Sequence, residues 1–228
     1  MEVPKFALKS RINKYRELNY DRLPKNCKVK RLSKYPYVVQ IKNVITDEEI
    51  KELLKMGKAK FQRSNMLIDG ELVYDEGRTS STAYIVKDGL PDQYSRPVEK
   101  FIKRIQYLTG CKREQIEMMM VRYRTGQKFK SHVDYFTPEE IGVIDTGGQR
   151  IYTFFIYLNT LHGDQGGATE FKYLGIKSKP RKGSCLFWHN QNLKTGEMIP
   201  ETEHSGNPVT AEGVVKYGLN CWIRSEPF

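Results

Sequence analysis

Two stretches in the first half of the chain have the hydrophobic spacing of amphipathic helices. The first is predicted over residues 46–58, where Thr46 and Glu49 stand three apart as in a capping box. The second is predicted over residues 94–108 and ends before Gly110, a typical stop signal. Its apolar residues recur every three or four positions: Val98, Phe101, Ile102, Ile105 and Leu108. We expect both helices to pack as supports on a sheet.

From residue 116 onward, short apolar runs separated by turn residues replace the helical spacing. The runs read IEMMMVRY, QRIYTFFIYLN, GATEF, GSCLFW, TEHS and VVKYGLNCWI. Such spacing favours a β-sandwich or a barrel. The run from Ile151 to Leu158 is apolar or aromatic at successive positions, as expected of a central strand that is covered on both faces.

Residues 62–82 lie between the two predicted helices and are largely polar. The dipeptide Asp69-Gly70 often closes a hairpin. We therefore expect a loop over a site, and we hypothesise that it orders when a substrate binds. Equal protease sensitivity of this loop with and without a saturating proline-rich peptide would count against that hypothesis.

Composition is that of an ordinary globular protein, with 228 residues, 39% hydrophobic and 29% charged. The net charge of +11 is uneven, because residues 1–35 contain eleven Lys or Arg and three acidic residues. We predict a basic N-terminal arm over 1–35, solvated, docked on the domain or attracting an anionic partner, and a single catalytic domain over 36–228.

Neither a secretory signal nor a membrane span is recognisable in the sequence, so we expect a cytoplasmic protein without a membrane partner. The cysteines form no Cys-x-x-Cys pair and are expected to be ordinary buried thiols: Cys27, Cys111, Cys185 and Cys221. We also expect a monomer.

His132 and Asp134 follow a strand-like segment, QKFK, and side chains two apart on a strand point to the same face. If His204 on a later, neighbouring strand completes the set, two imidazoles and one carboxylate would hold iron and leave its other coordination positions open. A competing His162-Gly163-Asp164 lies among clustered glycines, which predict a hairpin loop instead. His132 is therefore the better candidate.

With these residues in view, the chain resembles the catalytic domain of the prolyl 4-hydroxylases, especially the small ones of algae and of the large viruses that infect them. The likeness is strongest over residues 116–222 and leaves the first 35 residues unexplained. The matching pieces are Arg122-Tyr123, the His132-x-Asp134 pair, GGQR, TFFIYLN, GGATEF, GSCLFWHN, His204 and KYGLNCW, with GRTSS upstream at 77–81.

The resemblance implies a double-stranded β-helix, or jelly-roll, core in a mainly β protein with supporting N-terminal helices. It makes His132, Asp134 and His204 the iron ligands. It also makes Lys216 the partner of the distal carboxylate of 2-oxoglutarate, which fits a lysine in an otherwise apolar strand, where an unpaired ammonium is costly.

By the same likeness, Tyr123 and Thr153 would border the 2-oxoglutarate pocket, and Arg150 and Trp222 would face the peptide. Phe129 departs from the tyrosine of the algal relatives, so no hydroxyl contact to the peptide is expected there.

The implied activity is hydroxylation of peptidyl proline to 4-hydroxyproline, coupled to conversion of 2-oxoglutarate to succinate and CO2. It needs Fe(II), 2-oxoglutarate, dioxygen and ascorbate. The expected partner is a proline-rich peptide, whose polyproline II ribbon suits an aromatic-lined groove. If the protein is viral, it would act in the host cytoplasm.

Two alternatives stay open. A dioxygenase of the same fold could act on a lysyl residue or a nucleic-acid base, although Lys216 stands where nucleic-acid demethylases favour arginine and Arg224 is alone near the terminus. A non-catalytic β-sandwich could instead bind nucleic acid through its basic arm, but nucleic acid is the less expected partner.

Overall fold

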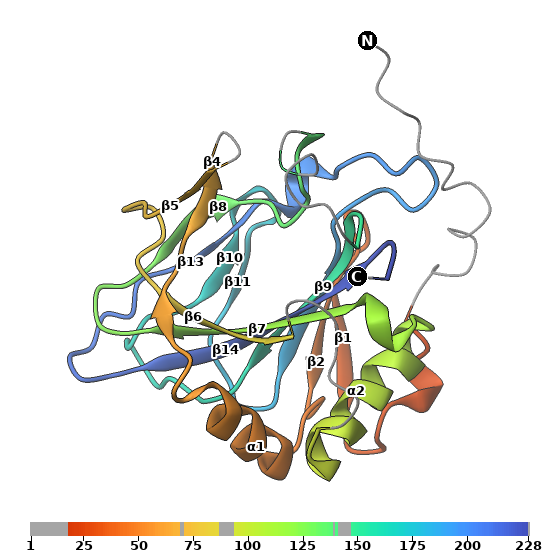
Figure 1. The fold of residues 1–228 in the computed structure, drawn as a ribbon, viewed down its shortest axis with the longest axis horizontal. Helices are drawn as coiled ribbons and strands as arrows, with labels where there is room; N and C mark the ends of the chain where they lie inside the picture. The colour runs from red at the N-terminus through yellow and green to blue at the C-terminus, as the bar shows by residue number, and fades with distance from the viewer. Residues whose placement is uncertain (1–17, 69–70, 87–93, 139, 141–146, 228) are drawn as a thin grey trace.

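The computed structural model describes residues 18–68, 71–86, 94–138, 140 and 147–227. Two antiparallel sheets face each other, and two helices lie against the outer face of the larger one (Figure 1). This is the predicted mainly β architecture with supporting helices, and its layers are arranged as in a jelly roll.

The larger sheet has eight strands among the described residues, and the smaller sheet that faces it has four. In spatial order, the larger sheet consists of β1 (Lys28–Ser33), β2 (Val38–Lys42), β12 (Cys185–His189), β9 (Arg150–Tyr157), β14 (Lys216–Arg224), β7 (Ile116–Tyr123), β6 (Ser81–Val86) and β3 (Gln62–Arg63). The smaller sheet consists of β11 (Ile176–Ser178), β10 (Thr169–Phe171), β13 (His204–Gly206) and β8 (Phe129–His132). Short 3-10 helices cover Tyr20–Arg22, Arg113–Gln115, Lys172–Leu174 and Pro200–Thr202.

Both predicted helices are confirmed. α1 spans Asp47–Gly57 and begins with the full capping box, in which Thr46 and Glu49 each bond the other's backbone N–H. α2 spans Arg96–Thr109 and ends at Gly110, whose φ of 73° is the left-handed conformation that glycine adopts readily. A bidentate ion pair from Arg104 to Glu49, at 2.8 and 2.9 Å, joins the two helices.

Two apolar clusters occupy the two faces of the larger sheet. One lies under the helices and the other lies between the sheets. β9 contributes Phe154 and Ile156 to the first cluster and Phe155 and Tyr157 to the second, which confirms a central strand covered on both sides.

Strand alternation decides which residues look toward the smaller sheet. The register pairs Trp222 of β14 with Glu117 of β7 and with Thr153 of β9, and it pairs Lys216 with Tyr123. Residues at every second position share a face, so all five belong to the inner face of the larger sheet. The site described below is built on this face.

The predicted loop over 62–82 contains more regular structure than expected. β4 (Met66–Ile68) and β5 (Glu71–Val73) pair as a hairpin, and β3 and β6 continue into the large sheet. Asp69 and Gly70 lie outside the described residues, and the ordering of this segment on substrate binding stays a prediction.

Residues 18–35 of the predicted basic arm are integrated into the domain. Leu18 is buried in the core and β1 is an edge strand paired with β2. The side chains of Lys28, Lys30 and Arg31 are exposed, and this polarity explains why the pattern did not predict a strand. Residues 1–17 lie outside the described part of the chain.

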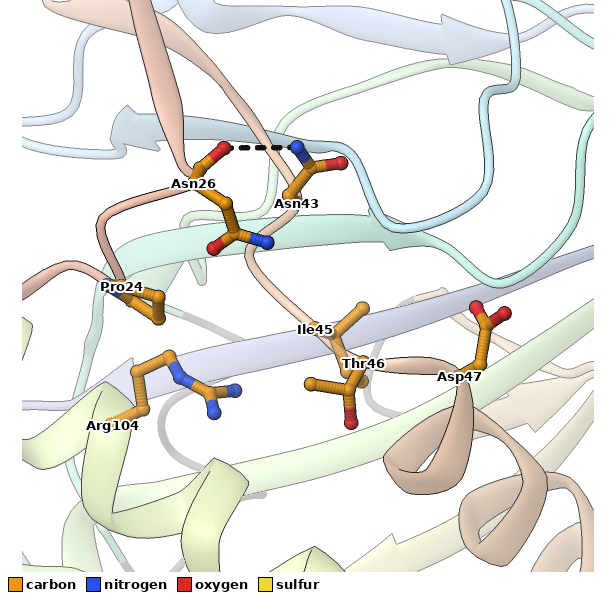
Figure 2. Close-up of a pocket in the computed structure, with 7 residues that line it drawn as sticks. All are labelled: Pro24, Asn26, Asn43, Ile45, Thr46, Asp47 and Arg104. Atoms are coloured by element: carbon orange, nitrogen blue, oxygen red, sulfur yellow. Dashed lines mark hydrogen bonds between the residues drawn. The ribbon is translucent and has the colours of Figure 1, made fainter.

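Two further features lie away from the inner face. A hollow of about 260 Å³ opens at the start of α1 beside Asn43 and Arg104 (Figure 2). The thiols of Cys111, Cys185 and Cys221 are free and buried.

None of the helices that the structure describes combines the length and the apolar character needed to cross a bilayer.

Candidate metal centre

The two histidines of the candidate site face each other across the smaller sheet. His132 ends β8 and His204 begins β13, and the register places them directly opposite, with ring centroids 4.3 Å apart. Asp134 follows His132 by two residues. Its Oδ1 lies 3.8 Å from His132 Nε2, and its Oδ2 lies 3.9 Å from His204 Nε2. The ligand atoms of the three residues all lie within 4.8 Å of one another.

Each imidazole is oriented by a backbone carbonyl. His132 Nδ1 lies 2.8 Å from the oxygen of Lys130, and His204 Nδ1 lies 3.0 Å from the oxygen of Thr202. A carbonyl can only accept, so Nδ1 carries the proton and Nε2 presents its lone pair to the centre. Burial, with the nearby His204, lowers the pKa of His132 to about 3, which keeps this imidazole neutral and able to bind a metal.

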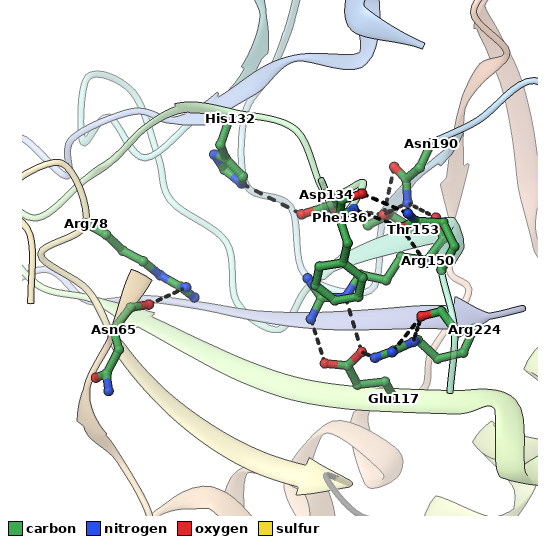
Figure 3. A network of polar contacts seen from close by, with 12 residues as sticks. Asn65, Arg78, Glu117, His132, Asp134, Phe136, Arg150, Thr153, Asn190 and Arg224 are labelled. Carbon is green, nitrogen blue, oxygen red and sulfur yellow. Dashed lines mark hydrogen bonds and ion pairs between the residues drawn. The ribbon is translucent and has the colours of Figure 1, made fainter. Parts of the chain in front are cut away.

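Asp134 is held by a buried polar group on β9 and the strand beside it (Figure 3). The hydroxyl of Thr153 donates to Asp134 Oδ2 at 2.8 Å and accepts from Asn190 Nδ2 at 2.9 Å. Burial alone would raise the pKa of Asp134, but the two histidines and Arg150 lower it overall. The carboxylate is therefore ionised, fixed in direction and placed between the two imidazoles.

Aromatic rings enclose the two histidines. Phe129 stacks on His132 with ring centroids 3.6 Å apart and planes 18° from parallel. Trp188 meets His204 edge-on at 4.7 Å, and Phe171 lies 5.3 Å from the same ring. These contacts lock the rotamers of both imidazoles. Two histidines and one carboxylate on one side of a metal are the donor set of non-haem Fe(II) oxygenases.

Lys216 ends in the core between the sheets with only 1% of its surface exposed. Its ammonium lies over the rings of Tyr123, Phe155 and Tyr157 at 4.9, 5.1 and 5.7 Å. Nζ has no hydrogen-bond partner among the described residues, and burial lowers the pKa of Lys216 to about 7. An ammonium in this position calls for an anion, which these described residues do not supply.

Arg150 and Arg224 share one buried carboxylate (Figure 3). Arg150 donates to both oxygens of Glu117 at 2.6 and 3.1 Å, and Arg224 Nη1 donates to Glu117 Oε2 at 2.9 Å. The guanidinium of Arg150 also covers Trp222 at 3.5 Å from the ring centroid. Burial opposes the charge of Glu117, but the two arginines lower its pKa overall.

Arg78 reaches the site from the segment that precedes β6. Its guanidinium lies 4.5 Å from the ring centroid of Phe129, the ring that stacks on His132. Arg78 Nη1 donates to the backbone oxygen of Asn65 at 2.9 Å.

The structure brings together His132, Asp134 and His204 as predicted and leaves the competing His162 exposed in a turn. The hydroxyl of Thr153 is bonded to Asp134, and the expected place of Thr153 at the border of the 2-oxoglutarate pocket stays a prediction. Sequence reasoning missed three neighbours: Arg78, Glu117 and Asn190. The GRTSS match at 77–81 was the one signal for Arg78, and Asn190 was the last residue of the matched segment GSCLFWHN but was not assigned a role.

A profile of the 2OG-Fe(II) oxygenase superfamily matches residues 118–224, which include all three candidate ligands and Lys216. The chain contains a 2OG-Fe(II) oxygenase domain. The cofactors expected from the sequence, Fe(II), 2-oxoglutarate and dioxygen, are those of this superfamily. An ascorbate requirement stays a prediction.

Prolyl 4-hydroxylases are similar to the 2OG-Fe(II) oxygenase domain and its flanks. Prolyl 4-hydroxylase subunit alpha-2 of Caenorhabditis elegans is 31% identical over 84% of this chain and 34% of its own length. Probable prolyl 4-hydroxylase 6 of Arabidopsis thaliana is 29% identical over 88% of this chain and 73% of its own length. This chain spans about a third of the animal subunits that it matches.

Solved structures of similar fold include the viral collagen prolyl hydroxylase from Paramecium Bursaria Chlorella virus-1, with a TM-score of 0.59 and 23% identity over 82% of this chain and 95% of that one. A Pseudomonas putida prolyl-4-hydroxylase has a TM-score of 0.55 and 16% identity over 82% of this chain and 92% of that one. These likenesses confirm the jelly-roll fold of the 2OG-Fe(II) oxygenase domain.

Proposed function

We propose that this protein hydroxylates peptidyl proline to 4-hydroxyproline, in a reaction coupled to oxidative decarboxylation of 2-oxoglutarate. The observation that carries the proposal is the pairing of two features on facing sheets. The set His132, Asp134 and His204 presents three ligand atoms to one point, and Lys216 holds an ammonium without a protein partner among the described residues. The names of the relatives supply the substrate class, a proline-containing peptide.

In this proposal His132, Asp134 and His204 hold Fe(II), and Lys216 pairs with the distal carboxylate of 2-oxoglutarate. When bound, the iron and 2-oxoglutarate supply the oxidising chemistry, and succinate and CO2 are the co-products. The protein's part is to position these groups. Carbonyl oxygens fix both imidazoles, Thr153 fixes the carboxylate, and the rings around Lys216 exclude water from its ammonium.

Tyr123 stays a proposed neighbour of 2-oxoglutarate, because its ring lies below the ammonium of Lys216. Trp222 stays a proposed contact of the peptide. Arg150 is proposed to act on the peptide through Nη1, the nitrogen that it does not use on Glu117, so Glu117 would set its direction. An ordered aromatic and guanidinium surface of this kind suits a proline-rich ribbon.

The test is an anaerobic titration with Fe(II) and 2-oxoglutarate, followed by air and a short proline-rich peptide whose mass is then read. We expect a gain of one oxygen atom that depends on both additives. His132→Ala and His204→Ala should abolish the gain, whereas His162→Ala, in an exposed turn, should keep it.

The titration is also followed by absorbance, because iron and 2-oxoglutarate bound together give a charge-transfer band. If this band forms but the peptide gains no mass, the result would support the proposed cofactors and reject the proline-rich peptide as the substrate. A methylated oligonucleotide and a lysine-containing peptide would then be the next substrates, because the same domain could serve either. Absence of the band would reject the proposed iron and 2-oxoglutarate site itself.

A further inference from the structure

Arg78 is held on a rigid backbone beside the strand that carries His132. Lys130 N donates to the oxygen of Gly77 at 2.6 Å, and Thr79 N donates to the oxygen of Lys128 at 3.0 Å. Between these bonds, Arg78 forms a bridge with Phe129. The segment 77–79 therefore extends the smaller sheet by one short strand-like stretch, and the base of the Arg78 side chain is fixed.

The guanidinium of Arg78 is fixed as well, but it is only partly satisfied. It contacts the ring of Phe129, which also stacks on His132, and the backbone oxygen of Asn65 accepts from Nη1. Nε is buried and has no hydrogen-bond partner, and no carboxylate forms an ion pair with Arg78, within the described part of the chain. Burial lowers the pKa of Arg78, as expected for a cation without a close counter-charge.

Positive charge is in excess around the centre. Among the residues that the structure describes, the cations are Arg78, Arg150, Lys216 and Arg224, and the carboxylates are Glu117 and Asp134. Fe(II) and the 2-oxoglutarate dianion cancel each other. Four protein cations then face two protein carboxylates, so a doubly positive excess remains after the cofactors bind.

Three of these cations lie on two opposite sides of the centre. Figure 3 shows Arg78 reaching toward the His132 and Asp134 pair from one side, and Arg150 with Arg224 on the other side. Arg150 and Arg224 are bonded to Glu117, and the ammonium of Lys216 lies in the core over the ring of Tyr123. Arg78 is thus the cation with a free, buried hydrogen-bond donor, and Lys216 is already assigned to 2-oxoglutarate.

We propose that the site selects proline peptides that carry a carboxylate, an Asp or Glu side chain, close to the target proline, and that Arg78 receives this carboxylate through its Nε edge. This inference rests on the proposed prolyl hydroxylation and names the substrate class within it. A planar guanidinium with a fixed direction is suited to a carboxylate, because two parallel N–H donors match its two oxygens. A purely structural role for Arg78, bonding the backbone of Asn65, would not explain why its Nε has no partner or why positive charge is in excess around the centre.

The experiment compares matched peptides that differ in one residue. A single Glu is moved along a proline-rich peptide through the positions on either side of the target proline, and each peptide has a partner with Gln in its place. Binding is measured anaerobically by fluorescence anisotropy of labelled peptides, with Fe(II) and 2-oxoglutarate present. Hydroxylation of the same peptides is then measured in air.

At one position we expect the Glu peptide to bind roughly tenfold more tightly than its Gln partner, the effect of one charge-assisted hydrogen bond. Arg78→Gln should abolish this ratio, so that the Glu and Gln peptides bind with equal affinity. Arg78→Lys should keep only part of it, because an ammonium lacks the planar fork. Arg181→Gln, at an exposed site after β11, is the matched control and should keep the full ratio.

The charge-transfer band with iron and 2-oxoglutarate reports whether each variant is folded and loaded. Equal binding of the Glu and Gln peptides at every position would overturn the acidic preference, and so would a preference that survives in Arg78→Gln. A rise in the 2-oxoglutarate requirement of Arg78→Gln, with its peptide ratio intact, would assign Arg78 to the cofactor instead. If peptides bind but none is hydroxylated, the proposed function fails separately from the recognition of charge.

Discussion

Single residues explain how much of the site the sequence could predict. The expectation that His132 and Asp134 converge is confirmed, but its reason was only half right, because β8 ends at His132 and Asp134 lies in the bend that follows. Lys216 was predictable because an ammonium is out of place in an apolar run. The bond from Arg150 to Glu117 was not predictable, since the two lie on β9 and β7 with β14 between them, and only the strand order brings them together.

Lys216→Ala is expected to raise the 2-oxoglutarate requirement by a factor of roughly a hundred, since a buried charge pair loses about 3 kcal/mol when one partner is truncated. The iron requirement should change little. Steady-state titrations of the two cofactors separate these effects. An equal rise in both requirements would make Lys216 a structural residue.

The same lysine gives the reaction a pH dependence. Burial holds the pKa of Lys216 at about 7 in the free protein, and a bound dianion would raise it. Binding above pH 7 then takes up a proton, so 2-oxoglutarate affinity falls as the pH rises. Lys216→Arg keeps its charge and should flatten this slope, which calorimetry in buffers of different ionisation enthalpy would show.

Thr153→Val is expected to weaken Fe(II) binding by about 10 to 100-fold, the usual effect of removing a hydrogen bond that orients a ligand. The carboxylate of Asp134 would lose its donor at 2.8 Å while the volume of the side chain is kept. Thr153→Ser retains the hydroxyl and should bind iron nearly as well as the unaltered protein. Metal titration followed by absorbance decides between these outcomes, and unchanged iron affinity in Thr153→Val would contradict the positioning role.

At the scale of elements, strong local signals were sufficient and weak ones were not. The capping box and the glycine stop predicted α1 and α2, and long apolar runs predicted β7, β9 and β14. β1 and β2 were missed. β1 has exposed basic residues, and its strand conformation depends on pairing with a neighbour that the local sequence does not reveal.

Thr46→Ala is expected to destabilise the fold by about 1 kcal/mol, because it removes one half of the capping box of α1. Thr46→Ser keeps the hydroxyl and should restore most of this loss. Urea denaturation gives both values. Hydroxylation by folded Thr46→Ala should be unchanged, since α1 lies on the outer face of the larger sheet; a loss of activity at full folding would show that the helix acts on the site.

For the molecule as a whole, the important contact is the one in which Glu117 joins separate parts of the sheet. It binds Arg150 of β9 and Arg224 of β14, and Arg224 also donates to the oxygen of Gly148 at 2.7 Å. The order of β9, β14 and β7 thus brings these three residues into one buried cluster of charges beside the candidate metal centre. Stability and the proposed recognition of substrate by Arg150 would therefore depend on the same residues.

Glu117→Gln is expected to destabilise the protein by about 3 to 5 kcal/mol at neutral pH, because two buried cations lose their shared carboxylate. The arginines lower the pKa of Glu117 overall despite its burial, so its contribution is present above the ordinary glutamate pKa and is lost as the pH falls through the lowered value. The stability gap between the two proteins should narrow in acid.

Denaturation curves at neutral and acidic pH measure this gap, with Glu114→Gln on the exposed surface as the control. A gap that stays constant with pH would show that the lost contacts are not electrostatic.

The positions of the two tryptophans, one beside a histidine and one beside an arginine of the site, have a consequence for fluorescence. The chain has two tryptophans; Trp188 lies against His204 and Trp222 lies under Arg150. Tryptophan emission, excited at a wavelength that the tyrosines do not absorb, therefore originates from the site. Iron should quench Trp188 and peptide should shift the emission of Trp222, so Trp222→Phe should keep the first response and lose the second. Occupancy of the two halves of the site could then be followed separately in the unlabelled protein.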